Sequence, residues 1–149
     1  MKTVLIVQRD SKYADDFAQW LEEAGYRTGV CTGPGQPHYE CWAETFSDCP
    51  LWRQSDLTIY DPWVQTGVNT FGSGQILNLE HLRHPNVPVL IWGTGAAIPK
   101  DIMEMEKPGQ LEILPMDISR EELVATVKRL IGPPDDARSA PASIAISSN

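Results

Sequence analysis

Five short apolar runs recur along the chain, and stretches with helical or turn-forming signals separate them. The runs lie at residues 3–8, 27–31, 57–61, 89–92 and 111–114. They have the length of strands, and near-continuous apolar character is typical of strands buried on both faces of a parallel sheet. Because each crossover between parallel strands places a helix on one face, this alternation predicts a three-layer α/β fold with strand order 2-1-3-4-5.

Helix start and stop signals fill the gaps between the runs. A helix after the first run can be capped by Asp10 or Ser11, and Gly25 ends it. Shorter helices are predicted at 74–82 and 99–106, with a further candidate at 39–46. The segment 119–122, Ser-Arg-Glu-Glu, is a capping box that opens the last helix. Apolar residues recur on one face of the first and last helices: Tyr13, Phe17, Leu21 and Ala24, then Leu123, Val127, Leu130 and Ile131.

The composition predicts one domain and a tail. A chain of 149 residues can bury one ordinary core, which we place at 1–132. Residues 133–149 are rich in Pro, Ala and Ser with few large apolar side chains, so we expect a disordered tail. The chain contains no apolar run of roughly 18 residues and no signal-peptide pattern, so we expect a cytoplasmic protein that does not enter a membrane.

The charge balance argues against nucleic acid as a partner. The chain carries 12 basic and 20 acidic residues, a formal net charge of -8. A phosphate backbone is bound by clustered Lys and Arg, whereas a net negative charge mainly favours solubility.

Asp61 is the leading candidate functional residue. It closes the run 57–61, and the first run ends in Gln8, Arg9 and Asp10. The carboxyl ends of neighbouring parallel strands meet at one edge of the sheet, where ligands bind in open α/β folds. We therefore expect a pocket containing these residues, with an ion pair between Arg9 and Asp61 because guanidinium and carboxylate form charge-assisted hydrogen bonds.

Four sequence strings carry a family resemblance: VLIVQRD at the start, EEAGYRTGV across the first helix and the second run, DLTIYD at the third run, and LPMDISREELVATVKRLI at the end. With these strings, residues 1–132 resemble the receiver domain of two-component response regulators, which has a flavodoxin-like fold. The resemblance implies a stand-alone signalling domain with no enzymatic activity. Its partner would be a histidine kinase or regulatory protein, and it could form a homodimer.

The resemblance also implies a set of pocket positions, and this chain departs from most of them. Receivers hold Mg²⁺ with two acids after the first strand, but Gln8 and Arg9 stand there, with Asp10 one step further. Asp61 matches the phosphoacceptor. A weak Mg²⁺ site would then rest on Asp10 and Asp61 with the carbonyl of Trp63.

Two further positions of the family pattern are changed as well. The threonine or serine after strand four falls on Gly93, with Thr94 one residue away, and the phosphate-contacting lysine falls on Met116. We therefore predict an atypical receiver-like domain that needs no cofactor and acts by protein–protein interaction without phosphorylation. The resemblance implies that it would bind through the face around strands four and five and the last helix. The alternative is a conventional phosphoacceptor that uses Asp61 and weakly bound Mg²⁺.

A second alternative rests on the cysteines. Cys31, Cys41 and Cys49 lie within nineteen residues, with His38 between them. Thiolate and imidazole are the ligands of zinc sites, although only His38 and Cys41 have typical ligand spacing. A metal or redox sensor and a set of buried thiols both remain open.

Aromatic and histidine side chains complete the candidates. Trp63 and Trp92 should lie near the carboxyl ends of strands, either in the core or as an exposed aromatic patch beside Asp61. His81 and His84 flank the end of a helix, where we expect both in solvent.

Overall fold

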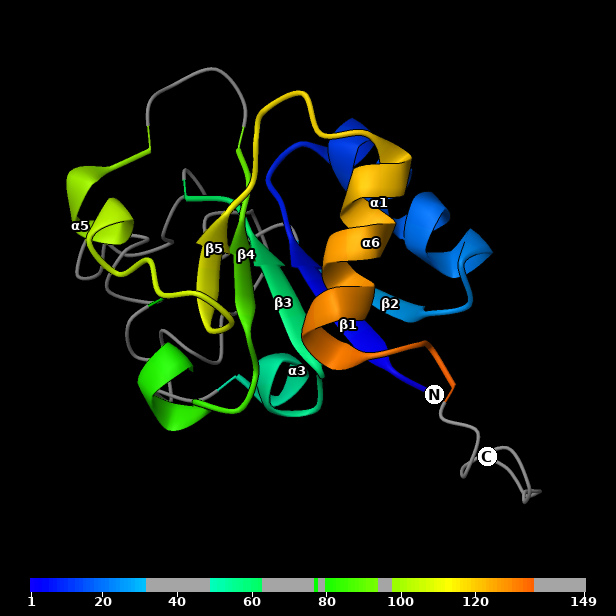
Figure 1. The fold of residues 1–149 in the computed structure, drawn as a ribbon, viewed down its shortest axis with the longest axis horizontal. Coiled ribbons are helices and arrows are strands. Elements are labelled where there is room, and N and C mark those ends of the chain that lie inside the picture. Colours follow the sequence, from blue (N-terminus) through cyan, green and yellow to red (C-terminus); the bar gives the residue numbers. More distant parts are fainter. Residues whose placement is uncertain (32–48, 63–76, 78–79, 94–97, 136–149) are drawn as a thin grey trace, which may run out of the picture.

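A computed structural model of the protein describes residues 1–31, 49–62, 77, 80–93 and 98–135. The candidate helix at 39–46, much of the predicted helix at 74–82 and most of the predicted tail lie outside these residues. The elements are shown in Figure 1: β1 (Thr3–Val7), α1 (Ser11–Glu23), β2 (Arg27–Cys31), α3 (Pro50–Arg53), β3 (Leu57–Tyr60), β4 (Val89–Ile91), α5 (Lys100–Met103), β5 (Leu111–Ile113) and α6 (Arg120–Ile131).

The predicted sheet is confirmed. Five parallel strands are ordered β2-β1-β3-β4-β5. Helices α1 and α6 cover one face of the sheet, while α3 and α5 lie on the opposite side (Figure 1). In the register of the sheet, Val7 of β1 pairs with Cys31 of β2 and with Tyr60 of β3. The carboxyl ends of these three strands therefore meet at the same edge.

Two apolar clusters hold the layers together, because successive side chains of a strand point to opposite faces. Val4 and Ile6 of β1 belong to one cluster, and Leu5 and Val7 belong to the other. The first cluster joins the sheet to α1 and α6 through Phe17, Leu21, Leu123 and Val127. The second joins it to α3, to the helical residue Leu77 and to α5 through Trp52, Leu77 and Ile102.

The ends of α1 follow the sequence signals. The side chain of Asp10 accepts a hydrogen bond from Lys12 N at 2.9 Å and caps the helix. Gly25 follows the helix with φ +100°, and a Cβ at this position would lie 3.0 Å from Pro134 Cγ. Lys2 N also donates to Pro134 O at 2.9 Å. Contacts with the domain continue past residue 132 as far as Asp135, whose Oδ1 lies 3.8 Å from the Met1 amino group.

The capping box at the start of α6 is present. Ser119 Oγ accepts from Glu122 N at 3.1 Å, and Glu122 Oε1 accepts from Ser119 N at 2.9 Å. Ser119→Ala should lower the free energy of unfolding by about 1 kcal/mol, because one backbone donor loses its partner. Urea unfolding followed by circular dichroism measures this change. An unchanged midpoint would show that the cap does not stabilise α6.

One helix was not predicted. Helix α3 has four residues, with Pro50 at its beginning, and it buries Trp52 to 2% exposure. A single turn is too short to show helical periodicity, and only the proline after Cys49 signals it. No helix of the described residues has the length and apolar character needed to cross a lipid bilayer.

Candidate functional site

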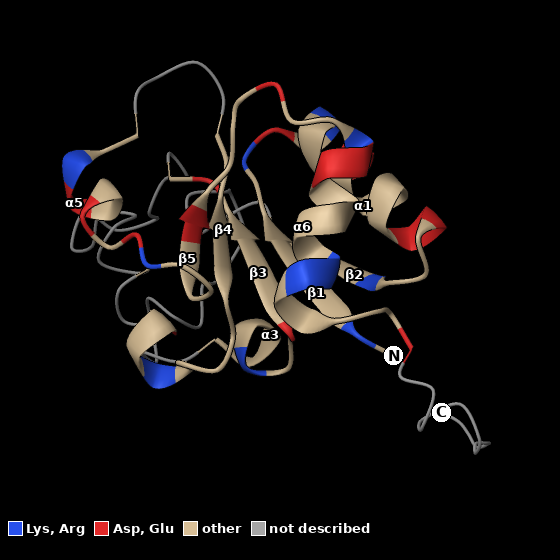
Figure 2. Cartoon of the chain, in the orientation of Figure 1, with Lys and Arg blue, Asp and Glu red and all other residues tan. Residues whose placement is uncertain are grey.

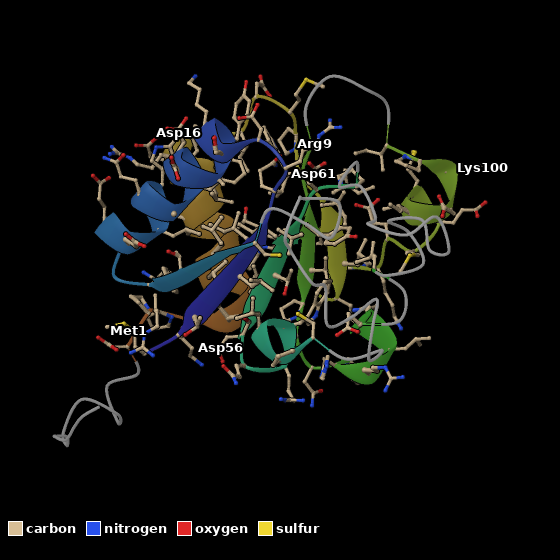
Figure 3. The ribbon with its side chains drawn as sticks, turned by 180° about the vertical axis from the view of Figure 1, so that it is seen from behind. Met1, Arg9, Asp16, Asp56, Asp61 and Lys100 are labelled. Atoms are coloured by element: carbon tan, nitrogen blue, oxygen red, sulfur yellow. The ribbon has the colours of Figure 1, made fainter. Side chains whose placement is uncertain are left out.

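The candidate site lies where β1 and β3 end. Asp61 follows β3 directly and its N–H donates to Val7 O at 2.8 Å, which extends the pairing of the two strands by one residue. Its side chain is completely buried. Figure 3 shows Asp61 beside Arg9 at one end of the sheet, with Asp56 at the opposite end. The sheet register therefore delivers the carboxylate to the edge that the sequence predicts.

The predicted ion pair between Arg9 and Asp61 is present. Arg9 Nε lies 3.2 Å from Asp61 Oδ2, and the backbone N–H of Arg9 donates to the same oxygen at 3.4 Å. The arginine side chain is 36% exposed, whereas the carboxylate is fully buried. Burying a charged carboxylate is costly unless it is paired. The guanidinium thus compensates the charge of Asp61 from the solvent side.

The other carboxylate oxygen faces the backbone at the end of β4. A Cβ built on Gly93 would lie 2.9 Å from Asp61 Oδ1 and 3.0 Å from Pro62 Cδ. Real Cβ atoms do not approach other heavy atoms this closely, so glycine is required for this packing. The position at which the family resemblance implies a threonine or serine is closed to any side chain by Asp61 itself.

The residues of this edge do not fit a Mg²⁺ site. Asp10 uses Oδ1 to cap α1, and Gln8 Oε1 accepts a hydrogen bond from Asp10 N at 3.1 Å. Arg9, which cannot ligate a cation, binds Asp61, and Trp63 lies outside the described residues. Mg²⁺ needs nearly octahedral oxygen coordination. Of the predicted ligands, the two in the described part of the chain, Asp10 and Asp61, each bind a donor of the protein, and the nearest fixed charge to Asp61 is positive.

No cationic side chain follows β5 where the family resemblance implies a lysine. Met116 is 57% exposed, and its carbonyl oxygen accepts from Trp92 Nε1 at 3.2 Å. Leu114, directly after β5, is 9% exposed and packs in the cluster under α6. Whether Leu114 or Met116 is taken as the equivalent position, the side chain cannot contact a phosphate with a positive charge.

Of the two positions expected for Trp92, the structure shows the one in the core. Its indole ring is 3% exposed and packs 5.0 Å from the ring of Tyr13 and 4.8 Å from that of Phe17. A tryptophan at the end of a buried strand fills the core here because α1 covers it. Trp63 and Thr94, the other predicted pocket residues, lie outside the described part of the chain.

The cysteine segment is only partly described, since Cys41 and His38 lie outside it. Cys31 and Cys49 are both half-buried. Burial, with smaller contributions from Glu80 and Cys31, raises the pKa of the Cys49 thiol to about 11, although backbone hydrogen bonds oppose the change. Within the described ranges no three His, Cys, Asp or Glu side chains come together as a potential metal site.

The thiol of Cys49 should therefore react slowly. Relative to an ordinary pKa of 9.0, a value of about 11 leaves roughly a hundredfold less thiolate at pH 8, and the thiolate is the nucleophile. We expect iodoacetamide to label Cys49 about a hundredfold more slowly in the native protein than in urea. Peptide mapping by mass spectrometry separates Cys49 from the other thiols, and equal native and unfolded rates would contradict this prediction.

A buried carboxylate that the sequence analysis missed lies at the opposite end of the sheet. Glu80 is completely buried and accepts a hydrogen bond from Cys49 N at 3.0 Å, and its Oε1 lies 3.6 Å from His84 Nε2. The side chain of His84 is only 14% exposed, so the expectation of a solvent position is wrong for this residue. The four-residue spacing of Glu80 and His84 was the sequence signal for this pair, because residues four apart on a helix lie side by side. Glu80 connects the beginning of α3 to the helix before β4 and has a structural role.

Comparison with solved structures identifies the architecture. The chain is similar to a response regulator receiver domain of Methanospirillum hungatei JF-1, with 16% identity, TM-score 0.65, and coverage of 88% of this chain and 94% of that one. A receiver domain of Clostridium thermocellum gives 16% identity, TM-score 0.66 and the same coverage. The chemotaxis protein CheY4 of Vibrio cholerae gives 18% identity, TM-score 0.59, and coverage of 87% and 98%.

At the level of sequence, neither a protein-family model nor a curated protein matches the chain. Identities of 15–18% with solved structures establish a fold, while the site must be judged from its own residues. This chain has the flavodoxin-like fold of response regulator receiver domains, with an arginine-bound aspartate at the end of its third strand.

Proposed function

We propose that this protein is an atypical receiver-like signalling domain that acts by protein–protein interaction and is not phosphorylated. It carries out no catalysis in this role and works in the cytoplasm. The pairing of Asp61 with Arg9 is the observation that carries the proposal. Phosphoryl transfer to a carboxylate requires an accessible oxygen and cations that neutralise the developing charge. Asp61 is completely buried, with Arg9 against its Oδ2 and Gly93 close to its Oδ1, so the carboxylate lacks an accessible oxygen.

Arg9 also supports the proposal through its charge. A guanidinium is positively charged at all physiological pH values. A metal ion can leave the pocket for the solvent, whereas Arg9 is part of the chain and keeps its charge beside Asp61. The pocket would then keep one state instead of switching between two. A domain of this kind can present a constant surface to its partner.

The face formed by β4, β5 and α6 is the proposed binding face. Arg129 of α6 donates two hydrogen bonds to Glu112 of β5, at 2.6 and 3.1 Å, and these lower the pKa of Glu112. Both residues line a shallow cavity of about 550 Å³ with Glu106. The Glu106 side chain also accepts a hydrogen bond from Ile113 N at 3.1 Å. The backbone of Lys107 forms an antiparallel β-bridge with that of Leu111. The edge of β5 is thus covered, which favours side-chain docking over addition of a strand.

Exposure to a small phosphodonor tests the proposal. The protein is incubated with acetyl phosphate and excess Mg²⁺, and intact mass is measured. We expect no gain of a phosphoryl group in the wild type. A gain that disappears in Asp61→Asn would overturn the proposal and establish the conventional phosphoacceptor instead.

A companion experiment asks whether Arg9 blocks the cation. Arg9→Asp removes the guanidinium and places two acids after β1, so we expect Mg²⁺ affinity to rise by roughly tenfold or more. Isothermal titration calorimetry measures the affinity, with Arg9→Gln as a control that removes the charge without adding a ligand. Equal affinities for the wild type and Arg9→Asp would show that Arg9 is not what excludes the ion.

A further inference from the structure

Helices α1 and α6 lie side by side on one face of the sheet and leave a groove between them (Figure 1). The groove has a volume of about 480 Å³, and its floor consists of Trp20 and Ala24 from α1 with Val124 and Ala125 from α6. Ala125 is exposed and the other three are half-buried. This groove is separate from both the Asp61 site and the cavity beside β5. An apolar depression on an otherwise charged surface is typical of a site that binds another apolar segment.

The chain leaves the described domain beside this groove. Pro134 lies at the end of α1, where a Cβ built on Gly25 would be 3.0 Å from Pro134 Cγ. Gly25 directly follows Ala24, which lines the groove. The chain beyond Asp135 is therefore tethered near the α1 side of the groove.

The sequence that follows contains one short apolar segment. Ile144 and Ile146 are the only large apolar side chains of residues 136–149, and their spacing of two would place both on the same side of an extended chain. Ile144 is nine residues from Asp135, a length of chain that spans up to about 30 Å. The part of α6 that lines the groove, residues 120–128, is only about 12 Å long. The apolar segment can therefore reach any part of the groove.

The charges around the groove favour an uncharged occupant. Its rim contains the acids Glu23 and Glu121 and the bases Arg120 and Lys128, and Figure 2 shows both signs on these helices. Arg120 lies 3.6 Å from Glu23 and 3.0 Å from Glu121. The rim therefore has no net formal charge, and residues 139–149, which contain no charged side chain, can cover the floor without breaking these pairs. A second copy of the chain, with a net charge of -8, would instead be repelled.

We propose that the segment around Ile144 and Ile146 binds in the groove between α1 and α6 of its own chain. The two isoleucines cover Trp20 and Val124, which removes apolar surface from water on both sides of the contact. Tethering favours this occupant over a separate molecule, because a short linker gives an effective concentration of roughly millimolar order. A tail whose composition predicts disorder can still become ordered over the few residues that bind. While bound, the segment closes the groove to other proteins, a property that does not rest on the proposed function.

Hydrogen–deuterium exchange of the full chain tests the contact. We expect the amides of residues 144–147 to exchange roughly tenfold more slowly in the wild type than in Ala125→Arg, whose side chain fills the groove. The tail has the same sequence in both proteins, so a difference reports on binding. Met103→Arg adds the same charge to α5, at a residue that is 54% exposed, and should leave the tail as slow to exchange as in the wild type. Equal exchange in the wild type and Ala125→Arg overturns the proposal.

A change in the tail tests the same contact without altering the helices. In NMR spectra of the wild type we expect nuclear Overhauser effects between the isoleucine methyl groups and the Trp20 ring. The double variant Ile144→Ser, Ile146→Ser should lose them and shift the Trp20 indole N–H signal. The control Ala140→Ser, Ala142→Ser makes the same tail more polar but keeps both isoleucines, so the signal should not move. An unshifted Trp20 signal in the isoleucine variant overturns the proposal.

Dilution separates this contact from one between molecules. Binding within one chain does not depend on protein concentration, so slow exchange at residues 144–147 should persist as the wild type is diluted. Slow exchange that is lost on dilution would assign the groove to a second copy and overturn the proposal.

Discussion

Replacing Arg9 by methionine should lower the free energy of unfolding by roughly 2–3 kcal/mol. The buried carboxylate of Asp61 loses a guanidinium at 3.2 Å, and breaking a buried pair typically costs about 3–5 kcal/mol. We expect a value below that range because the arginine side chain is 36% exposed, so water can partly solvate the site once it is removed. Methionine keeps much of the side-chain volume, which limits the loss to the charge and its hydrogen bonds. Urea unfolding monitored by circular dichroism measures the change.

A double-mutant cycle separates the pair from the rest of the packing. Asp61→Asn removes the negative charge with almost no change of shape, and in that background Arg9→Met should cost much less than in the wild type. Equal costs in the two backgrounds would mean that Arg9 stabilises the fold through its stem and not through Asp61. Arg9→Lys is an intermediate case, because lysine keeps the charge but lacks the planar fork.

Replacing Gly93 by alanine should destabilise the protein by roughly 1–3 kcal/mol. A Cβ at this position would lie 2.9 Å from Asp61 Oδ1 and 3.0 Å from Pro62 Cδ, so the carboxylate or the backbone must move. Because Asp61 is held by Arg9, movement of the carboxylate would also strain the ion pair. At a site with room, the same substitution usually stabilises a protein slightly by restricting the unfolded chain. A loss of stability in Gly93→Ala would therefore indicate that Asp61 lies close to Gly93, and a gain would indicate that it does not.

Gly29 in β2 is the matched control. A Cβ there would meet only Leu5 Cδ1, at 4.0 Å, which is an ordinary contact. Gly29→Ala should stay within about 0.5 kcal/mol of the wild type, or stabilise slightly. If both alanine variants have the same stability, Asp61 does not approach Gly93 as described. Combining Gly93→Ala with Asp61→Ala should recover part of the loss, because one of the two crowded neighbours is removed.

The order of the strands and the edge at which Asp61 lies could be predicted from the sequence. Residues 57–61 are an apolar run that ends in a carboxylate, and parallel strands joined by helices have few possible arrangements. The capping box at Ser119 and the stop at Gly25 are local signals that need no tertiary context. The pairing of Arg9 with Asp61 also followed, since one strand order places their strands side by side. The four-residue helix α3 did not follow, because one turn has no periodicity.

The sequence by itself determined the strand order, the acid at the end of β3 and the absence of a cation at Met116. These three features depend on residue identity and on patterns between residues close in the sequence, both of which can be read from the sequence directly. Only the tertiary structure decided that Gly93 packs against the Asp61 carboxylate, that Trp92 is buried under α1, and that Glu80 is buried and accepts a hydrogen bond from Cys49 N. Each of these contacts joins segments far apart in the sequence or depends on how deeply a helix covers the sheet. The same reason applies to the groove between α1 and α6, whose floor forms when two amphipathic helices, more than ninety residues apart in the sequence, pack on one face.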